Sequence, residues 1–271
     1  MKRVLKPSEP PALTSYRSAV PDSTWQAMKS DTAFNGPVAY NDCRSQLIAN
    51  QGGLCAYCEI DIRDNAPLKC RVEHFHPKSD IAPAHNWALD WGNLLGVCAG
   101  GSYAHTSTPG HYLFPTNANL SCDAHKDQMI QSGKLSEQCD GWILNPAQLQ
   151  ASPTLFKLEM STGKLQPNLG VCAISPPWPN NQHADLQALV QHTIDMLNLN
   201  CDRLIQARRR IIWDIEHNKK KQRDAGHTPQ QGMNNLVQYY LRQCWPGFFT
   251  TIRLCLGATV EAHLTNIRYQ G

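Results

Sequence analysis

The fold is decided by one short stretch of the chain, Arg71-Val72-Glu73-His74-Phe75-His76-Pro77-Lys78-Ser79. Val72 and Phe75 suit a short strand, and Pro77 ends it because proline cannot donate to a strand ladder. An acidic residue directly before a histidine presents a carboxylate and an imidazole to adjacent sides of one site. A carboxylate holds a hard divalent cation and a neutral imidazole deprotonates water, so Glu73 and His74 are candidates for these two tasks.

Cysteines flank this stretch on both sides. Cys55 and Cys58 are separated by two residues, the spacing with which two thiolates bind one tetrahedral zinc ion. Cys98 and Cys122 are the candidates for a second pair, although the 23 residues between them must then bulge out as a long loop. We therefore predict a four-cysteine zinc site. His105 and His111, inside that loop, are the alternative ligands, and single buried thiols are the structural alternative.

Composition narrows the class of protein. The chain has 271 residues, of which 41% are hydrophobic and 17% charged, so it can build a buried core. No apolar run approaches the ~18–20 residues that span a bilayer, and the basic N-terminus has no apolar signal-peptide region. The 11 cysteines are an odd number and too dilute for a disulfide scaffold. We expect a cytoplasmic, metal-holding protein without membrane contact, and its net charge of +3 permits nucleic-acid binding.

The predicted site is completed by three more residues, which come later in the chain. Asn93 carries an amide carbonyl that could accept the second N–H of the His74 imidazole and fix its tautomer. Asp123, next to Cys122, would supply a second carboxylate to the cation. Lys126 lies about one helical turn beyond Asp123, where its ammonium could meet a phosphate.

Prolines and hydrophobic periodicity divide the remaining chain. A short helix is expected near residues 23–28, another over 40–50, a hairpin over 154–166 and a proline-rich linker over 167–179. Later helices are expected over 186–197, 204–215 and 233–244, with Asn200 as an N-cap. The predicted fold class is α+β, in four parts: an extended N-terminal arm (1–37), a metal-binding core (38–150), a hairpin with linker (151–181) and a helical domain (182–271).

Together these motifs resemble a known family. The Cys55-x-x-Cys58 pair, Glu73-His74, Asn93-Leu94 and Cys122-Asp123 follow the pattern of the ββα-metal, or HNH, nucleases. The sequence is most specifically similar to the HNH endonuclease subunit of Septu-type and retron-associated anti-phage defence systems. That similarity includes the stretches 72–79, 93–98, 122–126, 144–146 and 197–200, so it spans nearly the whole chain.

The resemblance implies a zinc-stabilised ββα-metal core and assigns roles within it. His74 matches the general base, Glu73 the catalytic-metal ligand before it, and Asn93 the middle residue of the motif. Asp123 stands where the final histidine of the motif is usual, with His125 as the alternative ligand. These two residues lie ~200° apart around a helix, so only one of them can face the site.

The same resemblance implies cofactors and further contacts. Zn²⁺ is the expected structural ion, and Mg²⁺ or Mn²⁺ is the expected catalytic ion because both protein ligands are carboxylates. Lys78 and Lys126 are the expected phosphate contacts. The implied partner is an ATPase subunit, since the chain contains no Gly-x-x-x-x-Gly-Lys-Ser/Thr motif of its own.

The expected function is metal-dependent hydrolysis of nucleic-acid phosphodiester bonds in bacterial anti-phage defence. RNA, such as tRNA, is the alternative to DNA as substrate, because such a site contacts backbone and cation more than bases. A catalytically decayed, zinc-stabilised binding module is a second interpretation, against which the intact Glu-His-Asn-Asp set argues. A redox or zinc-storage protein is a third, and divalent-dependent cleavage would exclude it.

Overall fold

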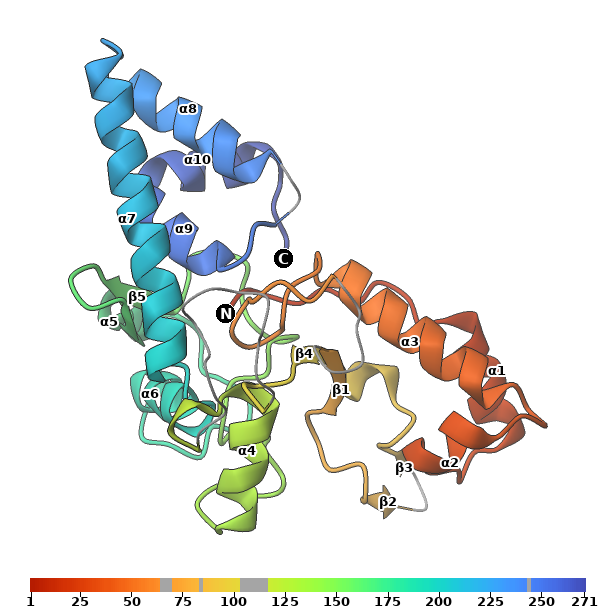
Figure 1. Ribbon diagram of the computed structural model, residues 1–271. Helices are drawn as coiled ribbons and strands as arrows, with labels where there is room; N and C mark the ends of the chain where they lie inside the picture. Colours follow the sequence, from red (N-terminus) through yellow and green to blue (C-terminus); the bar gives the residue numbers. More distant parts are fainter. Residues whose placement is uncertain (64–69, 83–84, 103–116, 243–244) are drawn as a thin grey trace.

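The computed structural model describes residues 1–63, 70–82, 85–102, 117–242 and 245–271 (Figure 1). The fold is α+β, as predicted: helices make up most of the regular structure, and the described strands pair into small two-stranded antiparallel sheets. None of the described helices combines the length and the apolar character needed to cross a bilayer.

A strand pair and the helix that follows it lie at the centre of the molecule. Strand β1 (Cys70–His74) pairs antiparallel with β4 (Leu94–Cys98), so that His74 lies opposite Leu94. Every residue of β4 is buried, which matches its uninterrupted apolar sequence. Helix α4 (Cys122–Gln131) begins beyond the end of β4 and contacts that strand. The short strands β2 (Ile81–Ala82) and β3 (His85–Asn86) and the 3₁₀ turns η1 (Trp91–Asn93) and η2 (Asn117–Asn119) lie between these elements.

The N-terminal segment is not the extended arm that its prolines suggested. It forms α1 (Pro11–Ala19) and α2 (Trp25–Ser30), which pack on α3 (Gly36–Asn50). Proline occupies the first turn of both α1 and α3, where its missing N–H costs nothing and its fixed φ favours the helix. The prolines therefore begin helices here, and only the short helix expected near residues 23–28 was predicted correctly.

These three helices have an apolar core of their own. Leu13 and Tyr16 of α1, Trp25 and Met28 of α2, and Cys43 of α3 are all buried together. The same cluster includes residues that lead into and start β4, namely Ala88, Leu89, Trp91 and Leu94. The N-terminal helices are consequently attached to the β1–β4 region by buried contacts.

The second half of the chain contains the predicted hairpin and helices. Strands β5 (Phe156–Glu159) and β6 (Lys164–Pro167) form the hairpin expected over 154–166. The expected linker over 167–179 is interrupted by α5 (Leu169–Ile174), because the Asn168 side chain caps the N-terminus of this short helix. The remaining helices are α6 (Leu186–Met196), α7 (Asp202–Asp224), α8 (Pro229–Leu241), α9 (Phe249–Leu256) and α10 (Ala258–Asn266).

Asn200 joins the hairpin to these helices instead of capping one of them. The N-cap of α7 is Cys201, one residue later than expected. The Asn200 side chain accepts from the Leu165 N–H and donates to the Leu165 carbonyl, each at 2.9 Å. In Figure 1, α7–α10 extend to one side of the β1–β4 pair and α1–α3 to the other.

The packing of α1 predicts a large stability difference between two truncations. Leu13→Ala removes a side chain that is 0% exposed, and it should lower the free energy of unfolding by about 2–5 kcal/mol. Val38→Ala, at a position of α3 that is 52% exposed, should change it by no more than about 0.5 kcal/mol. Urea unfolding followed by circular dichroism measures both. Equal effects would mean that α1 does not pack as described.

Candidate active site and cysteine cluster

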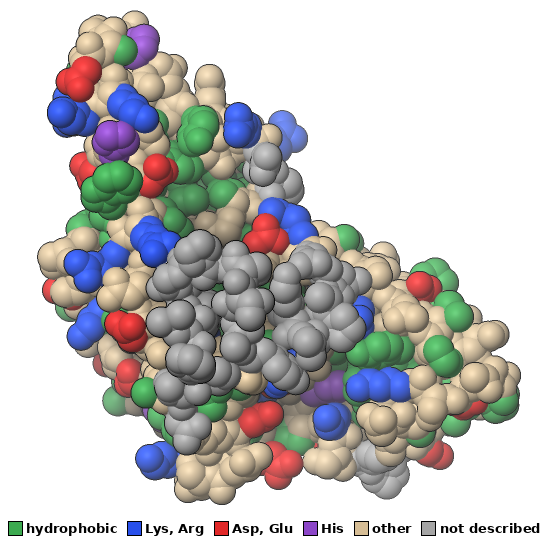
Figure 2. Space-filling model, viewed as in Figure 1, with side chains coloured by type: hydrophobic (Ala, Val, Ile, Leu, Met, Phe, Trp, Pro, Cys, Tyr) green, Lys and Arg blue, Asp and Glu red, His purple; other side chains and the backbone are tan. Residues whose placement is uncertain are grey.

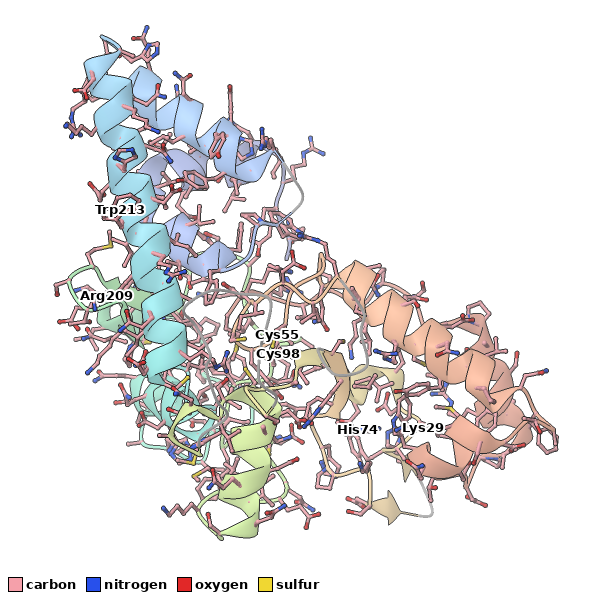
Figure 3. The ribbon with its side chains drawn as sticks, in the orientation of Figure 1. Lys29, Cys55, His74, Cys98, Arg209 and Trp213 are labelled. Atoms are coloured by element: carbon pink, nitrogen blue, oxygen red, sulfur yellow. The ribbon has the colours of Figure 1, made fainter. Side chains whose placement is uncertain are left out.

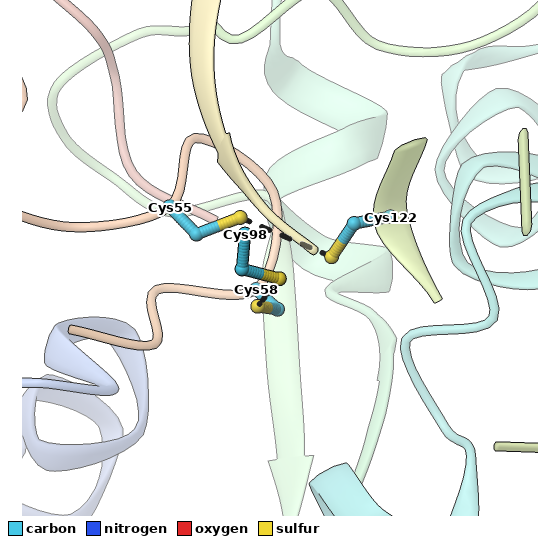
Figure 4. A group of neighbouring side chains, drawn as sticks. All are labelled: Cys55, Cys58, Cys98 and Cys122. Carbon is cyan, nitrogen blue, oxygen red and sulfur yellow. Dashed lines mark hydrogen bonds between the residues drawn. The ribbon is translucent and has the colours of Figure 1, made fainter. Parts of the chain in front are cut away.

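Four buried cysteines lie together at the junction of the loop before β1, the end of β4 and the start of α4 (Figure 4). The Sγ atoms of Cys55 and Cys122 are 3.9 Å apart, those of Cys58 and Cys98 are 3.6 Å apart, and all four lie within 4.8 Å of one another. Thiolates sharing a tetrahedral zinc at ~2.3 Å have sulfurs ~3.8 Å apart, whereas a disulfide needs ~2.05 Å. The four sulfurs therefore have the spacing of ligands to one metal ion.

The pKa values of three of these thiols are shifted, and in different directions. Burial raises the pKa of the Cys58 and Cys122 thiols, whereas hydrogen bonds from the other three cysteines hold the pKa of Cys98 well below its usual value. The Gly100 backbone N–H donates to the Cys98 sulfur at 3.4 Å. Gly100 has φ +63°, and a Cβ there would lie 2.3 Å from the Ser121 carbonyl, so only glycine allows this turn.

The sequence predicted the same four cysteines and left two alternatives open. His105 and His111 lie outside the described residues, so their positions are not compared with the cluster. The group Cys55, Cys58, Cys98 and Cys122 can hold a metal ion without either histidine.

The His74 ring is buried and held in one orientation. Its Nε2 lies 3.1 Å from the Ala88 carbonyl oxygen, which can only accept, so Nε2 carries the proton and Nδ1 is left with a free lone pair. The Trp25 ring packs edge-on against the imidazole, with centroids 4.9 Å apart. Burial lowers the pKa of His74 to about 4, although the bond to Ala88 opposes this shift. The ring is therefore a neutral base at neutral pH.

Asn93 does not contact the His74 ring, and this corrects the role predicted for it. Its Oδ1 accepts from the His76 N–H at 2.6 Å, and its Nδ2 donates to the carbonyls of His76 and Trp87 at 3.0 and 2.9 Å. Through these bonds, the Asn93 side-chain amide is bonded to backbone groups at both ends of the segment between β1 and β4. Asn93 thus fixes the backbone that follows His74, while Ala88 takes the tautomer-fixing role.

Glu73 and Asp123 bring two buried carboxyl groups together from β1 and α4. Burial and, next, the neighbouring Glu73 carboxylate raise the pKa of Asp123 well above its usual value. Arg71 Nη1 lies 3.5 Å from Asp123 Oδ2 and offsets part of this effect. Two adjacent carboxyl oxygens are the donors that Mg²⁺ and Mn²⁺ prefer, so the pair fits a hard divalent cation.

His125 points away from this pair. Its Nδ1 lies 2.9 Å from the Met196 carbonyl oxygen at the end of α6. Asp123, two positions earlier on α4, lies beside Glu73 instead. Of the two alternatives for the last ligand, only Asp123 lies beside Glu73.

Lys126 is buried behind Glu73, and this corrects its predicted contact with phosphate. Its Nζ donates to Glu73 Oε1 at 2.5 Å and to the His74 and Phe75 carbonyls at 3.2 and 3.3 Å. Burial alone would lower the pKa of Lys126, but the Glu73 charge outweighs it and raises this pKa. All three ammonium protons are used within the protein, so Lys126 holds the Glu73 carboxylate in place.

A cleft of about 440 Å³ opens over these groups. Glu73, His74 and Asp123 line it, and so does the exposed Lys78. Figure 3 shows Lys29 beside His74, and in the same region Figure 2 shows lysine or arginine side chains next to a histidine.

Sequence reasoning missed the other wall of this cleft. Trp25 and Lys29 of α2 and Tyr40 and Arg44 of α3 line it. No spacing within the sequence connects these residues with Glu73-His74, because contacts between the N-terminal helices and β1 bring them together only after folding.

Comparison with known proteins identifies the family of this chain. No protein-family model matches the chain. The chain is 34% identical over 256 residues to the "Retron Ec83 putative HNH endonuclease" of Escherichia coli, a match that covers 93% of this chain and 92% of the relative. The chain belongs to the HNH endonuclease family. This relationship makes it an endonuclease and agrees with the resemblance inferred from Glu73-His74 and Asn93.

The environment of His74 in this HNH endonuclease predicts how it responds to pH. The folded-state pKa of about 4 lies below the ~6.5 of a free imidazole, so the unfolded chain takes up the proton first. This contribution to stability is fully present above pH ~6.5 and is lost as the pH falls toward 4. At pH 5.5, ¹⁵N NMR should show His74 neutral, with Nε2 protonated and Nδ1 bare.

His74→Gln is the matched variant, because it lacks the titrating ring. It should lose less stability than the wild type between pH 6.5 and 4 in urea unfolding. A charged His74 at pH 5.5 would mean that water reaches the ring and that its burial is misassigned.

Proposed function

We propose that this chain is a metal-dependent nuclease in which His74 is the general base and Glu73 and Asp123 hold a divalent cation. The observation that supports the proposal is the convergence of these three groups, from β1 and α4, at one cleft. The antiparallel β1–β4 pair followed by α4 supports a ββα-metal core, since strand, strand and helix occur in that order around the site.

The orientation of His74 suits proton abstraction from water. The Ala88 carbonyl holds Nε2–H, which leaves the lone pair of Nδ1 to accept a proton from the attacking water. The water oxygen forms the new bond to phosphorus, and the bond to the leaving oxygen breaks. A cation held by Glu73 and Asp123 would supply positive charge to a non-bridging oxygen and the leaving oxygen. Lys126 keeps the Glu73 carboxylate aligned for this task.

The cysteine cluster supports a structural role for Zn²⁺. All four cysteines are buried, and none of them lines the cleft. The cluster adjoins the cleft through Cys122, because the next residue, Asp123, lines it. Binding one ion would join the loop before β1, the end of β4 and the start of α4. Such a site contributes folding free energy rather than catalysis.

We further propose a role in anti-phage defence with a separate ATPase subunit. The relationship to a retron HNH endonuclease supports the defence context, and the sequence resemblance extends it to Septu-type systems. The chain contains no phosphate-binding Gly-x-x-x-x-Gly-Lys-Ser/Thr motif, so nucleotide hydrolysis would belong to the partner. DNA is the first candidate substrate and RNA, such as tRNA, the alternative.

One cleavage assay tests the catalytic assignments. The wild-type chain, alone and with its ATPase partner, should cleave mixed DNA or RNA substrates when Mg²⁺ or Mn²⁺ is added. His74→Ala should lower the rate by about 10²–10⁴-fold, because general-base catalysis is lost. Asp123→Ala should abolish the divalent-dependent reaction, whereas His125→Ala, the matched variant on the other side of α4, should keep most of it.

Three results would contradict the assignments. Full activity in His74→Ala would remove this residue as the base. Loss of activity in His125→Ala but not in Asp123→Ala would make His125 the ligand. No cleavage of either nucleic acid by a folded, metal-loaded wild type would favour a catalytically decayed binding module.

The zinc assignment has an independent test. Freshly purified protein should contain about one zinc per chain by elemental analysis. Cys98→Ser should lose this zinc and unfold more easily, whereas Cys43→Ser, at a buried cysteine of α3 outside the cluster, should retain it. Absence of zinc from the wild type would refute the site. Zinc retained in Cys98→Ser or Cys122→Ser would instead implicate His105 or His111.

A further inference from the structure

The N-terminal helices form one wall of the active-site cleft. Trp25 and Lys29 of α2 line the cleft together with Tyr40 and Arg44 of α3, and Glu73 and Asp123 line it as well. The wall also touches the catalytic group directly, because the Trp25 ring lies edge-on to the His74 imidazole. The helices over residues 11–50 therefore complete the site instead of lying beside it.

This wall presents positive charge to the cleft. Lys29 Nζ lies 5.0 Å from the centre of the Tyr40 ring, and the Arg44 guanidinium carbon lies 5.9 Å from the same ring. The aromatic ring thus orients both cations by cation–π attraction. Lys78, at the start of the segment after β1, lines the cleft as well.

These cations are close enough to influence one another. The pKa of Lys29 is lowered, first by burial and then by the charges of Lys78 and Arg44. The acidic residues Asp127 and Glu137 also line the cleft, and they come from α4 and the segment after it. Like charges gathered on one wall raise the local positive potential and attract an anion.

We propose that Lys29 and Arg44, together with Lys78, form a phosphate-binding subsite for the nucleic-acid backbone next to the scissile bond. The ligand is a phosphodiester chain, of DNA or RNA, whose neighbouring phosphates reach the wall formed by α2 and α3. This inference rests on the proposed nuclease function. It assigns to the N-terminal helices the phosphate contact that the buried Lys126 is unable to make.

Binding, measured separately from cleavage, tests the subsite. In a His74→Ala background, fluorescence anisotropy follows labelled duplex DNA and labelled single-stranded RNA over a series of KCl concentrations. Lys29→Gln should weaken binding several-fold and lower the slope of log K against log [KCl] by about 0.9 for duplex DNA or 0.7 for a single strand. Lys29→Arg should restore the slope, because it keeps the charge.

The matched control is Lys157→Gln, since Lys157 is an exposed lysine of β5, outside the cleft. It should leave both the affinity and the salt dependence unchanged. A response to Lys29→Gln in the DNA arm, the RNA arm or both supports the subsite and identifies its ligand.

Unchanged binding and slope in both arms would overturn the subsite. The proposed nuclease function fails on a different observation, namely no divalent-dependent cleavage by the wild type. A chain that cleaves nucleic acid but is indifferent to Lys29→Gln would therefore contradict the subsite alone.

Discussion

The juxtaposition of four cysteine sulfurs is the constraint on which the site depends. It joins the loop that precedes β1, the end of β4 and the first residue of α4 within 4.8 Å. Asp123 follows Cys122 directly, so fixing this cysteine also fixes the carboxylate that faces Glu73. Tyr57, between Cys55 and Cys58, adds a second link, because its hydroxyl lies 3.5 Å from Glu73 Oε1. The cysteine cluster and the Glu73–Asp123 carboxyl pair are thus parts of one buried arrangement.

The degree of burial determines whether each ionisable group of the site is paired, neutral or exposed to solvent. In a medium of low dielectric, an unpaired charge is costly, so each buried ionisable group needs a partner or becomes neutral. Lys126 donates its three N–H groups to Glu73 and two backbone carbonyls. His74 is uncharged and lies against Trp25 and the Ala88 carbonyl. Lysines at the cleft, Lys29 and Lys78, retain contact with solvent and are the ones suited to a phosphate backbone.

The N-terminal helices show how prolines can mislead an interpretation of local sequence. Pro11 and Pro37 lie in the first turns of helices, so they are compatible with the structure that they were expected to prevent. Because Leu13 and Tyr16 pack against α3, the segment is a fixed wall of the cleft. The family relationship to an HNH endonuclease covers nearly the whole chain, which is consistent with these helices belonging to the enzyme rather than forming an added arm.

Features that depend on short spacing could be predicted from the sequence: the Cys55-x-x-Cys58 pair, the Glu73-His74 pair on a strand, and the hairpin expected over 154–166, whose strands span 156–167. The sequence also showed that Asp123 and His125 were mutually exclusive, since helix geometry is local. Long-range packing determines which of them faces Glu73, and that Ala88 rather than Asn93 holds the His74 ring. It alone placed Lys126 behind Glu73, 53 positions away, and α2 beside His74. Those contacts depend on how buried surfaces pack and how buried charges find partners, and neither is encoded in the spacing of neighbouring residues.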